Sequence, residues 1–301
     1  MHILVTGGTG FVGSNLVKEL YKQGHEITIT GSDAEQDVGK FIKKYLQPGL
    51  LGIDWSATGQ IDVLYHEAAI NDTTLNDREE MMRANLSASM ELFEHAVENG
   101  CKRIVYASST AVYGNAPAPF KEDGPITPLN VYGESKKMLD EFVAEFVVQN
   151  PDVVVVGLRY CNVYGPGEQH KSKRASMIYQ LAQQMEKGNP KLFKFGEQKR
   201  DWIYIDDVVK ANLLASEAKE SCIVNCGSGS ATSFNEIVEI LNEVVGVKRT
   251  VDYIDNPFAD KYQDFTYCDM SKAAEKIGFK PEYDIKKGIK QYYSTGKLIS
   301  N

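Results

Sequence analysis

The chain opens on the stretch Met1-His2-Ile3-Leu4-Val5-Thr6-Gly7-Gly8-Thr9-Gly10-Phe11-Val12-Gly13, an apolar run that leads directly into a glycine-rich turn. The apolar run predicts a buried β-strand, and the amphipathic residues after the turn predict a helix. Glycines at this junction permit a tight turn and let backbone N–H groups approach a pyrophosphate, which then lies at the positive end of the helix dipole. The stretch therefore predicts a dinucleotide site whose cofactor contacts are Gly7, Gly10, Phe11, Val12 and Gly13.

Outward from this turn, short β-rich runs alternate with amphipathic stretches through the first half of the chain. Such alternation indicates βαβ units and a parallel sheet with helices on both faces. Strands are expected near Ile3–Thr6, Ile27–Thr30, Val63–His66, Ile104–Ser108 and Val153–Leu158. Helices are expected near Val12–Gln23, Glu79–Asn99 and Leu129–Gln149. The fold class predicted is α/β, a Rossmann-type doubly wound parallel sheet.

The second half of the chain has a less regular pattern, which predicts a smaller C-terminal lobe. It contains two helix patterns and one strand pattern, near Ser176–Lys187, Asn235–Val245 and Val224–Cys226. Residues 1–165 are expected to form the dinucleotide-binding Rossmann domain, to which a segment near 202–230 returns. Residues 166–301 are expected to form mainly a substrate-binding lobe at the carboxyl end of the sheet, where open α/β folds bind their ligands.

The composition is typical of a globular protein with no nucleic acid or membrane partner. The chain has 301 residues, 43% hydrophobic side chains and a net charge of −8, which does not favour polyanions or anionic membranes. No apolar run approaches the roughly 20 residues that span a bilayer, and the start of the chain does not resemble a signal peptide. Five scattered cysteines are typical of reduced thiols, with no metal site expected. The expected location is cytoplasmic.

The residues after the second expected strand bear on the choice between NAD and NADP. An acidic side chain there would accept hydrogen bonds from the adenosine ribose, but the sequence reads Gly31-Ser32-Asp33. Gly31 and Ser32 leave room for a 2′-phosphate, which favours NADP slightly, whereas Asp33 would serve NAD. Three lysines nearby would neutralise such a phosphate: Lys40, Lys43 and Lys44. Both cofactors stay open, and Ser32 and Asp33 are predicted cofactor contacts.

A second chemical signal is the spacing Tyr132-Gly133-Glu134-Ser135-Lys136, which places a phenol and an amine one turn apart on an expected helix. Such a lysine can lower the pKa of the phenol and hydrogen-bond the nicotinamide ribose, so that Tyr132 exchanges a proton near neutral pH. The spacing alone is common, and its significance comes from the dinucleotide turn upstream. Ser109, at the end of an expected strand, would share the substrate proton with Tyr132.

With these motifs the chain resembles the extended short-chain dehydrogenases/reductases, a family of nucleotide-sugar epimerases, dehydratases, decarboxylases and reductases. The motifs run from Thr6-Gly7-Gly8-Thr9-Gly10 through His66-Glu67-Ala68-Ala69 and Tyr132-x-x-x-Lys136 to Arg200-Asp201-Trp202-Ile203-Tyr204-Ile205-Asp206-Asp207. The resemblance implies an enzyme with tightly bound NAD or NADP and a sugar nucleotide substrate. It implies further cofactor contacts at Asp54, Trp55, Ala68, Ala69 and Asn85. It also places Asn162 at the sugar nucleotide and Arg200 on its diphosphate, which an arginine fork can bind through two oxygens.

The reaction type is narrowed by the residues around the catalytic pair. Dehydratases of this family carry an acid and a base directly after the catalytic Ser or Thr, whereas Thr110 and Ala111 stand here. The stretch Asn162-Val163-Tyr164-Gly165-Pro166-Gly167-Glu168-Gln169-His170-Lys171 resembles the ADP-glyceromanno-heptose 6-epimerases. By this resemblance Lys171 is a second acid/base opposite Tyr132, and the substrate is contacted by Ser109, His170, Lys171 and Tyr262.

Two proton-transfer groups suit inversion by oxidation and re-reduction, because the keto sugar must present opposite faces of its carbonyl to one fixed hydride donor. A basic loop of Lys171, Lys173 and Arg174 over the diphosphate is the alternative, and the run Ser172-Lys173-Arg174 departs from the heptose enzymes. A UDP-hexose 4-epimerase, a 4-keto nucleotide-sugar reductase and a regulatory dinucleotide-binding protein also stay open. The resemblance also implies a homo-oligomer, in which the subunits pair through the two long helices near Glu79–Asn99 and Leu129–Gln149.

Overall fold

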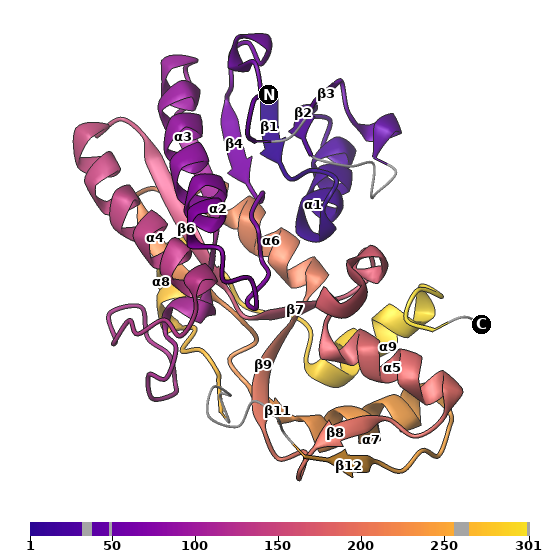
Figure 1. The fold of residues 1–301 in the computed structure, drawn as a ribbon. Helices are drawn as coiled ribbons and strands as arrows, with labels where there is room; N and C mark the ends of the chain where they lie inside the picture. The colour runs from indigo at the N-terminus through magenta and orange to yellow at the C-terminus, as the bar shows by residue number, and fades with distance from the viewer. Residues whose placement is uncertain (32–37, 48–49, 256–264, 300–301) are drawn as a thin grey trace.

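The computed structural model describes residues 1–31, 38–47, 50–255 and 265–299, and Figure 1 shows a large sheet flanked by helices above a smaller lobe. Seven strands form one parallel sheet in the order β10-β6-β5-β4-β1-β2-β3. Their bounds are β1 His2–Thr6, β2 Glu26–Thr30, β3 Lys44–Leu46, β4 Val63–His66, β5 Arg103–Ser109, β6 Val154–Tyr160 and β10 Cys222–Cys226. The predicted fold class is confirmed, and the five strands expected in the first half lie within two residues of their predicted bounds.

Alternating side chains of the strands build two cores, one on each face of this sheet. Ile3 and Val5 of β1 pack with α1 (Phe11–Lys22) and α6 (Ile205–Ser216), whereas Leu4 between them packs with α3 (Ala88–Glu98) and α4 (Val131–Gln149). This period of two is the reason that parallel strands become apolar throughout when helices cover both faces.

The helix expected over 79–99 is divided into three segments. It consists of α2 (Arg78–Met82), a π-helical turn (Arg83–Ser87) and α3. Asn85 lies in the π-helical turn and is buried, and its amide hydrogen-bonds both backbone groups of Ile70. Helical bulges of this kind occur where a side chain takes a special role, and here the amide fixes the segment that follows β4.

The smaller lobe is built from short strands and helices that sequence patterns largely missed. A three-stranded sheet has the order β11-β9-β7 and a two-stranded sheet pairs β12 with β8. The elements are β7 Asn162–Tyr164, α5 Met177–Lys187, β8 Lys191–Phe193, β9 Lys199–Tyr204, β11 Ala231–Ser233, α7 Phe234–Val245, β12 Asp252–Ile254 and α9 Ile285–Ser294. The helix α8 (Ser271–Ile277) instead packs against β10 and α6 at the edge of the large sheet. Only α5 and α7 were expected, and α7 begins with the capping box of Ser233 and Glu236. The lobe shares one continuous core with α1 and α6.

Candidate active site

A cavity of about 840 Å³ opens at the carboxyl ends of β1, β4, β5 and β6. This is the edge at which open α/β sheets bind ligands. The two halves of the sheet, β1-β2-β3 and β4-β5-β6-β10, meet between the neighbouring strands β1 and β4, and both of these strands end at the cavity. Thirteen of the predicted site residues line the cavity: Gly7, Gly10, Phe11, Val12, Gly13, Ala68, Ala69, Ser109, Tyr132, Lys136, Asn162, His170 and Lys171.

The glycine turn between β1 and α1 forms one wall. A Cβ atom on Gly13 would lie 2.2 Å from the carbonyl oxygen of Gly7, and Gly7 itself has a φ of +65°. Gly10 caps α1 without any side-chain hydrogen bond to the first-turn N–H groups. Such N–H groups and the close-packed backbone match what a pyrophosphate requires, so the turn fits a dinucleotide.

Tyr132 and Lys136 lie in the first turns of α4, and a close backbone contact brings them to the cavity. Asn130 caps the helix by accepting from the Gly133 N–H at 2.8 Å. A Cβ on Gly133 would lie 2.6 Å from the carbonyl oxygen of Ala111, so only glycine lets α4 approach the segment after β5 this closely. The phenol of Tyr132 consequently reaches hydrogen-bond range of Ser109.

The electrostatics of this pair differ from the expectation drawn from its spacing. Burial raises the pKa of Tyr132, the hydrogen bond to Ser109 opposes this, and the negative charge of Glu67 raises the pKa further. The Lys136 amine is buried and donates to the Ala107 carbonyl oxygen at 2.7 Å. Burial lowers its pKa to about 8, against the opposing effect of Glu67 and Asp140. Burial therefore sets the pKa of Tyr132 above its ordinary value, and the lowering by Lys136 that the spacing predicts is not among the causes of this shift.

Glu67 is a cavity residue to which the sequence analysis gave no role. It follows β4, and its Oε1 accepts a hydrogen bond from the Tyr160 hydroxyl at 2.9 Å. The Asn212 amide donates to the same hydroxyl at 2.8 Å. Burial raises the pKa of Glu67 to about 7, which the Tyr160 hydrogen bond and the charge of Lys136 oppose. The signal available in the sequence was a carboxylate directly after an expected strand, in the motif His66-Glu67-Ala68-Ala69.

Lys171 and His170 lie in a 3-10 helical segment, Gln169–Arg174, that forms the wall nearest α1. The Lys171 Nζ is 5.4 Å from the centroid of the Phe11 ring. Glu168 anchors this segment, because its buried carboxylate accepts from the N–H of Gly165 at 3.1 Å and from the hydroxyl of Ser176 at 3.0 Å. The loop that carries Lys171 is thus held at both ends.

Several predicted contacts lie away from the cavity walls. Asp54 is exposed and caps a short 3-10 helix, and the Trp55 ring is tilted against the His95 ring with their centroids 5.5 Å apart. Asn85 holds the segment behind Ala69 rather than facing the cavity, and the Arg200 guanidinium lies 5.9 Å from the Phe234 ring. Ser32, Asp33 and Tyr262 lie outside the described residues. The roles assigned to all of these residues stay predictions.

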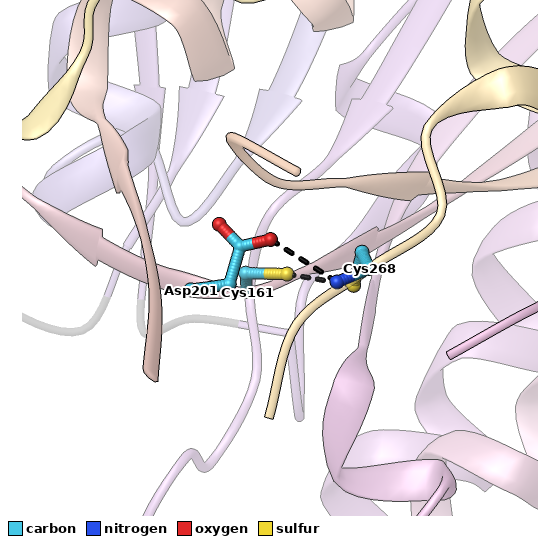
Figure 2. Close-up of side chains that lie close together, drawn as sticks. All are labelled: Cys161, Asp201 and Cys268. Carbon is cyan, nitrogen blue, oxygen red and sulfur yellow. Dashed lines mark hydrogen bonds between the residues drawn. The ribbon is translucent and has the colours of Figure 1, made fainter. Parts of the chain in front are cut away.

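Cys161, Asp201 and Cys268 form the one group in the described part of the chain that brings three metal-ligand atoms together (Figure 2). The two Sγ atoms are 2.8 Å apart. Both Asp201 carboxylate oxygens already accept hydrogen bonds, from Ser228 at 2.7 Å, Gly229 at 3.1 Å and the Cys268 N–H at 3.2 Å. Because these N–H and O–H donors use the carboxylate, the group joins three segments of the chain and is poorly suited to a cation.

The fold and the cavity define a dinucleotide-binding α/β enzyme. Residues 3–227 match the model of the NAD dependent epimerase/dehydratase family. The chain belongs to this family, in which its solved neighbours are nucleotide-sugar epimerases, and its cofactor is NAD(P). Among the described residues, none of the helices combines the length and apolar character needed to cross a bilayer.

Solved structures of similar proteins cover nearly the whole chain. The ADP-L-glycero-D-manno-heptose-6-epimerase of Helicobacter pylori is 38% identical, with 98% of this chain and 95% of that chain covered and a TM-score of 0.86. The UDP-glucose 4-epimerase of Thermotoga maritima, solved with UDP-glucose, is 27% identical over 98% and 99%, with a TM-score of 0.88. The UDP-glucuronic acid 4-epimerase of Bacillus cereus, solved with UDP-glucuronic acid and NAD, is 25% identical over 98% of both chains, with a TM-score of 0.83.

Proposed function

We propose that this protein inverts a carbinol centre of an ADP-linked heptose, as an ADP-L-glycero-D-manno-heptose 6-epimerase does, by oxidation and re-reduction. The observation that carries the proposal is that one cavity holds two separate groups able to transfer protons. Tyr132 comes from α4 on one face of the sheet, and Lys171 lies against Phe11 of α1, which covers the other face. The 38% identity to the Helicobacter pylori enzyme also supports this substrate.

Some residues of the cavity bind the cofactor and others transfer protons. NAD(P), when bound, supplies the acceptor and donor of hydride, and the glycine turn with its free first-turn N–H groups would hold its pyrophosphate. Tyr132 takes the proton of the sugar hydroxyl in one pose, with Ser109 as its hydrogen-bond partner. Lys171 donates or accepts the proton in the opposite pose. Lys136, whose side chain lines the cavity, would orient the ribose of the dinucleotide.

A UDP-hexose 4-epimerase is the second candidate. It is favoured by the TM-score of 0.88 to the Thermotoga maritima enzyme, which slightly exceeds that to the heptose enzyme. Such an enzyme needs one proton-transfer group, because the oxidised sugar turns about its diphosphate. Lys171 would then serve only as a diphosphate contact, so the two candidates differ in what Lys171 does.

The experiment follows inversion by NMR with purified protein and no added cofactor, on ADP-heptose and UDP-hexose panels. Tyr132→Phe should lower kcat on the true substrate by about 100- to 10,000-fold, the usual contribution of a general acid/base. Lys171→Met should lower kcat to a similar degree and leave nucleotide-sugar affinity unchanged. Lys187→Met, at an exposed lysine of α5, is the matched control and should match the wild type. Normal inversion of ADP-heptose by Lys171→Met, or turnover of UDP-hexose alone, would contradict the proposal.

A further inference from the structure

The Lys171 segment, residues 165–174, lies against the first two turns of α1 (Figure 1). The half-buried Asn15 makes the direct link, since its side-chain amide donates to the carbonyl oxygens of Pro166 and Phe11, each at 2.9 Å. Both partners are acceptors, so the amide nitrogen faces them and can supply one proton to each. One side chain therefore joins the start of the Lys171 segment to the helix that follows the glycine turn.

Gly167 lets the Lys171 segment approach α1 this closely. A Cβ atom there would lie 2.9 Å from the Asn15 Nδ2 and 3.4 Å from Cδ2 of the Phe11 ring, and the φ of Gly167 is +109°. The Gly167 N–H donates to the Gln169 side chain at 2.9 Å, and the Gln169 amide donates to the Tyr292 hydroxyl at 2.9 Å. The backbone beside the Asn15 contact is therefore also tied to α9.

The amine of Lys171 lies over the same end of α1. Its Nζ is 5.4 Å from the centroid of the Phe11 ring, within the range of a cation–π contact, and both side chains line the cavity. Phe11 begins α1 directly after Gly10, at the helix end that fits the pyrophosphate. Asn15 is four residues beyond Phe11, so the two side chains lie on one face of α1. This face of α1 therefore holds both the backbone and the amine of the segment.

We propose that Asn15 is a positioning residue for Lys171: by joining the backbone at Pro166 to α1, it sets where the Lys171 amine stands relative to the dinucleotide site. A lysine stem is flexible, so its amine is placed only as well as its backbone is fixed. Proton transfer needs hydrogen-bond range, and a displacement of about 1 Å can lower a rate by about 100-fold. The inference rests on the proposed function, because it concerns the group that serves the second pose of the sugar.

The first test is a double-mutant cycle on kcat for inversion of ADP-heptose, followed by NMR. Asn15→Leu keeps a similar branched shape and removes both hydrogen bonds, so it should lower kcat by roughly 10- to 100-fold and leave the KM for the nucleotide sugar unchanged. In a Lys171→Met background the same change should have almost no further effect, because the group that Asn15 positions is gone. A similar loss in both backgrounds would mean that Asn15 only supports the fold, and would overturn the inference.

A second variant and a matched control complete the cycle. Asn15→Asp keeps the shape but places oxygens against both carbonyl groups, so its kcat should fall at least as far as that of Asn15→Leu. The control is Asn150→Leu, because the Asn150 amide donates to the Phe146 carbonyl oxygen of its own helix at 3.0 Å, the same local bond that Asn15 makes with Phe11. The control should match the wild type, whereas a wild-type kcat in Asn15→Asp would contradict the inference.

The second test does not depend on turnover. Amide hydrogen exchange of the holoenzyme, followed by mass spectrometry, should be faster in Asn15→Leu than in the wild type across residues 166–174, because the segment loses its link to α1. Exchange in α7, which lies in another part of the smaller lobe, should be the same in both proteins. Exchange across residues 166–174 that does not differ between the two proteins would overturn the inference.

Failure of the inference is distinguishable from failure of the proposed function. If Lys171→Met loses inversion while Asn15→Leu keeps the wild-type kcat, the role of Asn15 alone is overturned. If Lys171→Met inverts ADP-heptose normally, or the wild type inverts no nucleotide sugar, the proposed function is overturned. The exchange measurement then still decides whether Asn15 fixes the Lys171 segment on α1.

Discussion

His66, the last residue of β4, has a buried ring with both nitrogens in hydrogen bonds. Nδ1 lies 2.7 Å from the Thr6 hydroxyl and Nε2 lies 2.7 Å from the Ser89 hydroxyl. Burial and the charge of Lys136 lower its pKa to about 3. A ring that stays neutral and joins β1 to α3 through hydrogen bonds acts as a structural support for the strand end that carries Glu67.

The low pKa of His66 leads to a prediction about how the free energy of unfolding depends on pH. The unfolded ring binds a proton below about 6.5 and the folded ring does not, so this residue's contribution to stability is present above pH 6.5 and is lost as the pH falls toward 3. Between pH 7.5 and pH 5 the wild type should lose about 2 kcal/mol more of its free energy of unfolding than His66→Asn, measured with urea. His25→Asn, at a partly exposed ring, should behave like the wild type. An equal loss in wild type and His66→Asn would show that the ring is protonated in the folded protein.

At the scale of elements, several helix ends follow signals that are local in the sequence. The αL glycines Gly24 and Gly100 follow α1 and α3, with φ of +81° and +87°. Ser233 and Glu236 form the reciprocal bonds of a capping box at the start of α7. These signals are local, because a cap satisfies the N–H or C=O groups of its own helix.

The turn before α1 gives a prediction at the same scale. In Gly13→Ala the new Cβ would lie 2.2 Å and 2.8 Å from the oxygen and carbon of the Gly7 carbonyl, which are backbone atoms that cannot rotate away. An overpacking cost of about 1–3 kcal/mol should open the turn and weaken NAD(P) binding by roughly 5- to 150-fold in calorimetry. Gly24→Ala, at the other end of α1 with no atom within 4 Å of the new Cβ, should keep its affinity. Unchanged NAD(P) affinity in Gly13→Ala would remove this turn from the cofactor site.

At the scale of the whole molecule, one buried network joins α4 to the sheet and to the C-terminal part of the chain. Arg159 of β6 donates to the Asp140 carboxylate of α4 at 2.9 Å, and both side chains are under 10% exposed. The same guanidinium donates to the Tyr113 hydroxyl at 3.0 Å, which in turn donates to Asn225 of β10 at 2.6 Å. A buried charge pair thus holds α4, the helix that carries Tyr132 and Lys136, against β6 of the sheet.

Removing one member of the Asp140/Arg159 pair should lower the free energy of unfolding by more than the intact pair contributes to it. Asp140→Ala leaves the Arg159 charge buried and should lower the free energy of unfolding by about 3–5 kcal/mol. The double variant Asp140→Ala with Arg159→Met should cost clearly less than the sum of the two single changes. Glu243→Gln, in the exposed pair with Lys286, should cost under about 1 kcal/mol. Additive single changes in urea unfolding would mean that the two charges are not coupled.

The predicted homo-oligomer and the division of the chain at residue 165 are also questions at this scale, and both stay predictions. The shared core of α1, α6 and the smaller lobe favours one cooperative unit rather than two independent ones.

The sequence alone determined the doubly wound sheet, the glycine turn and the Tyr132/Lys136 pair, because strand alternation, helix periodicity and turn chemistry depend on neighbours in the chain. Only the tertiary structure decided that Arg200 and Asp54 are not among the residues lining the cavity and that the short strands of the smaller lobe pair. It also brought Glu67 to Tyr160, 93 residues later, across a strand between them. Such contacts follow from the order of the strands in the sheet, and burial then changes the pKa of each group. Neither the strand order nor the burial can be predicted from neighbouring residues in the chain.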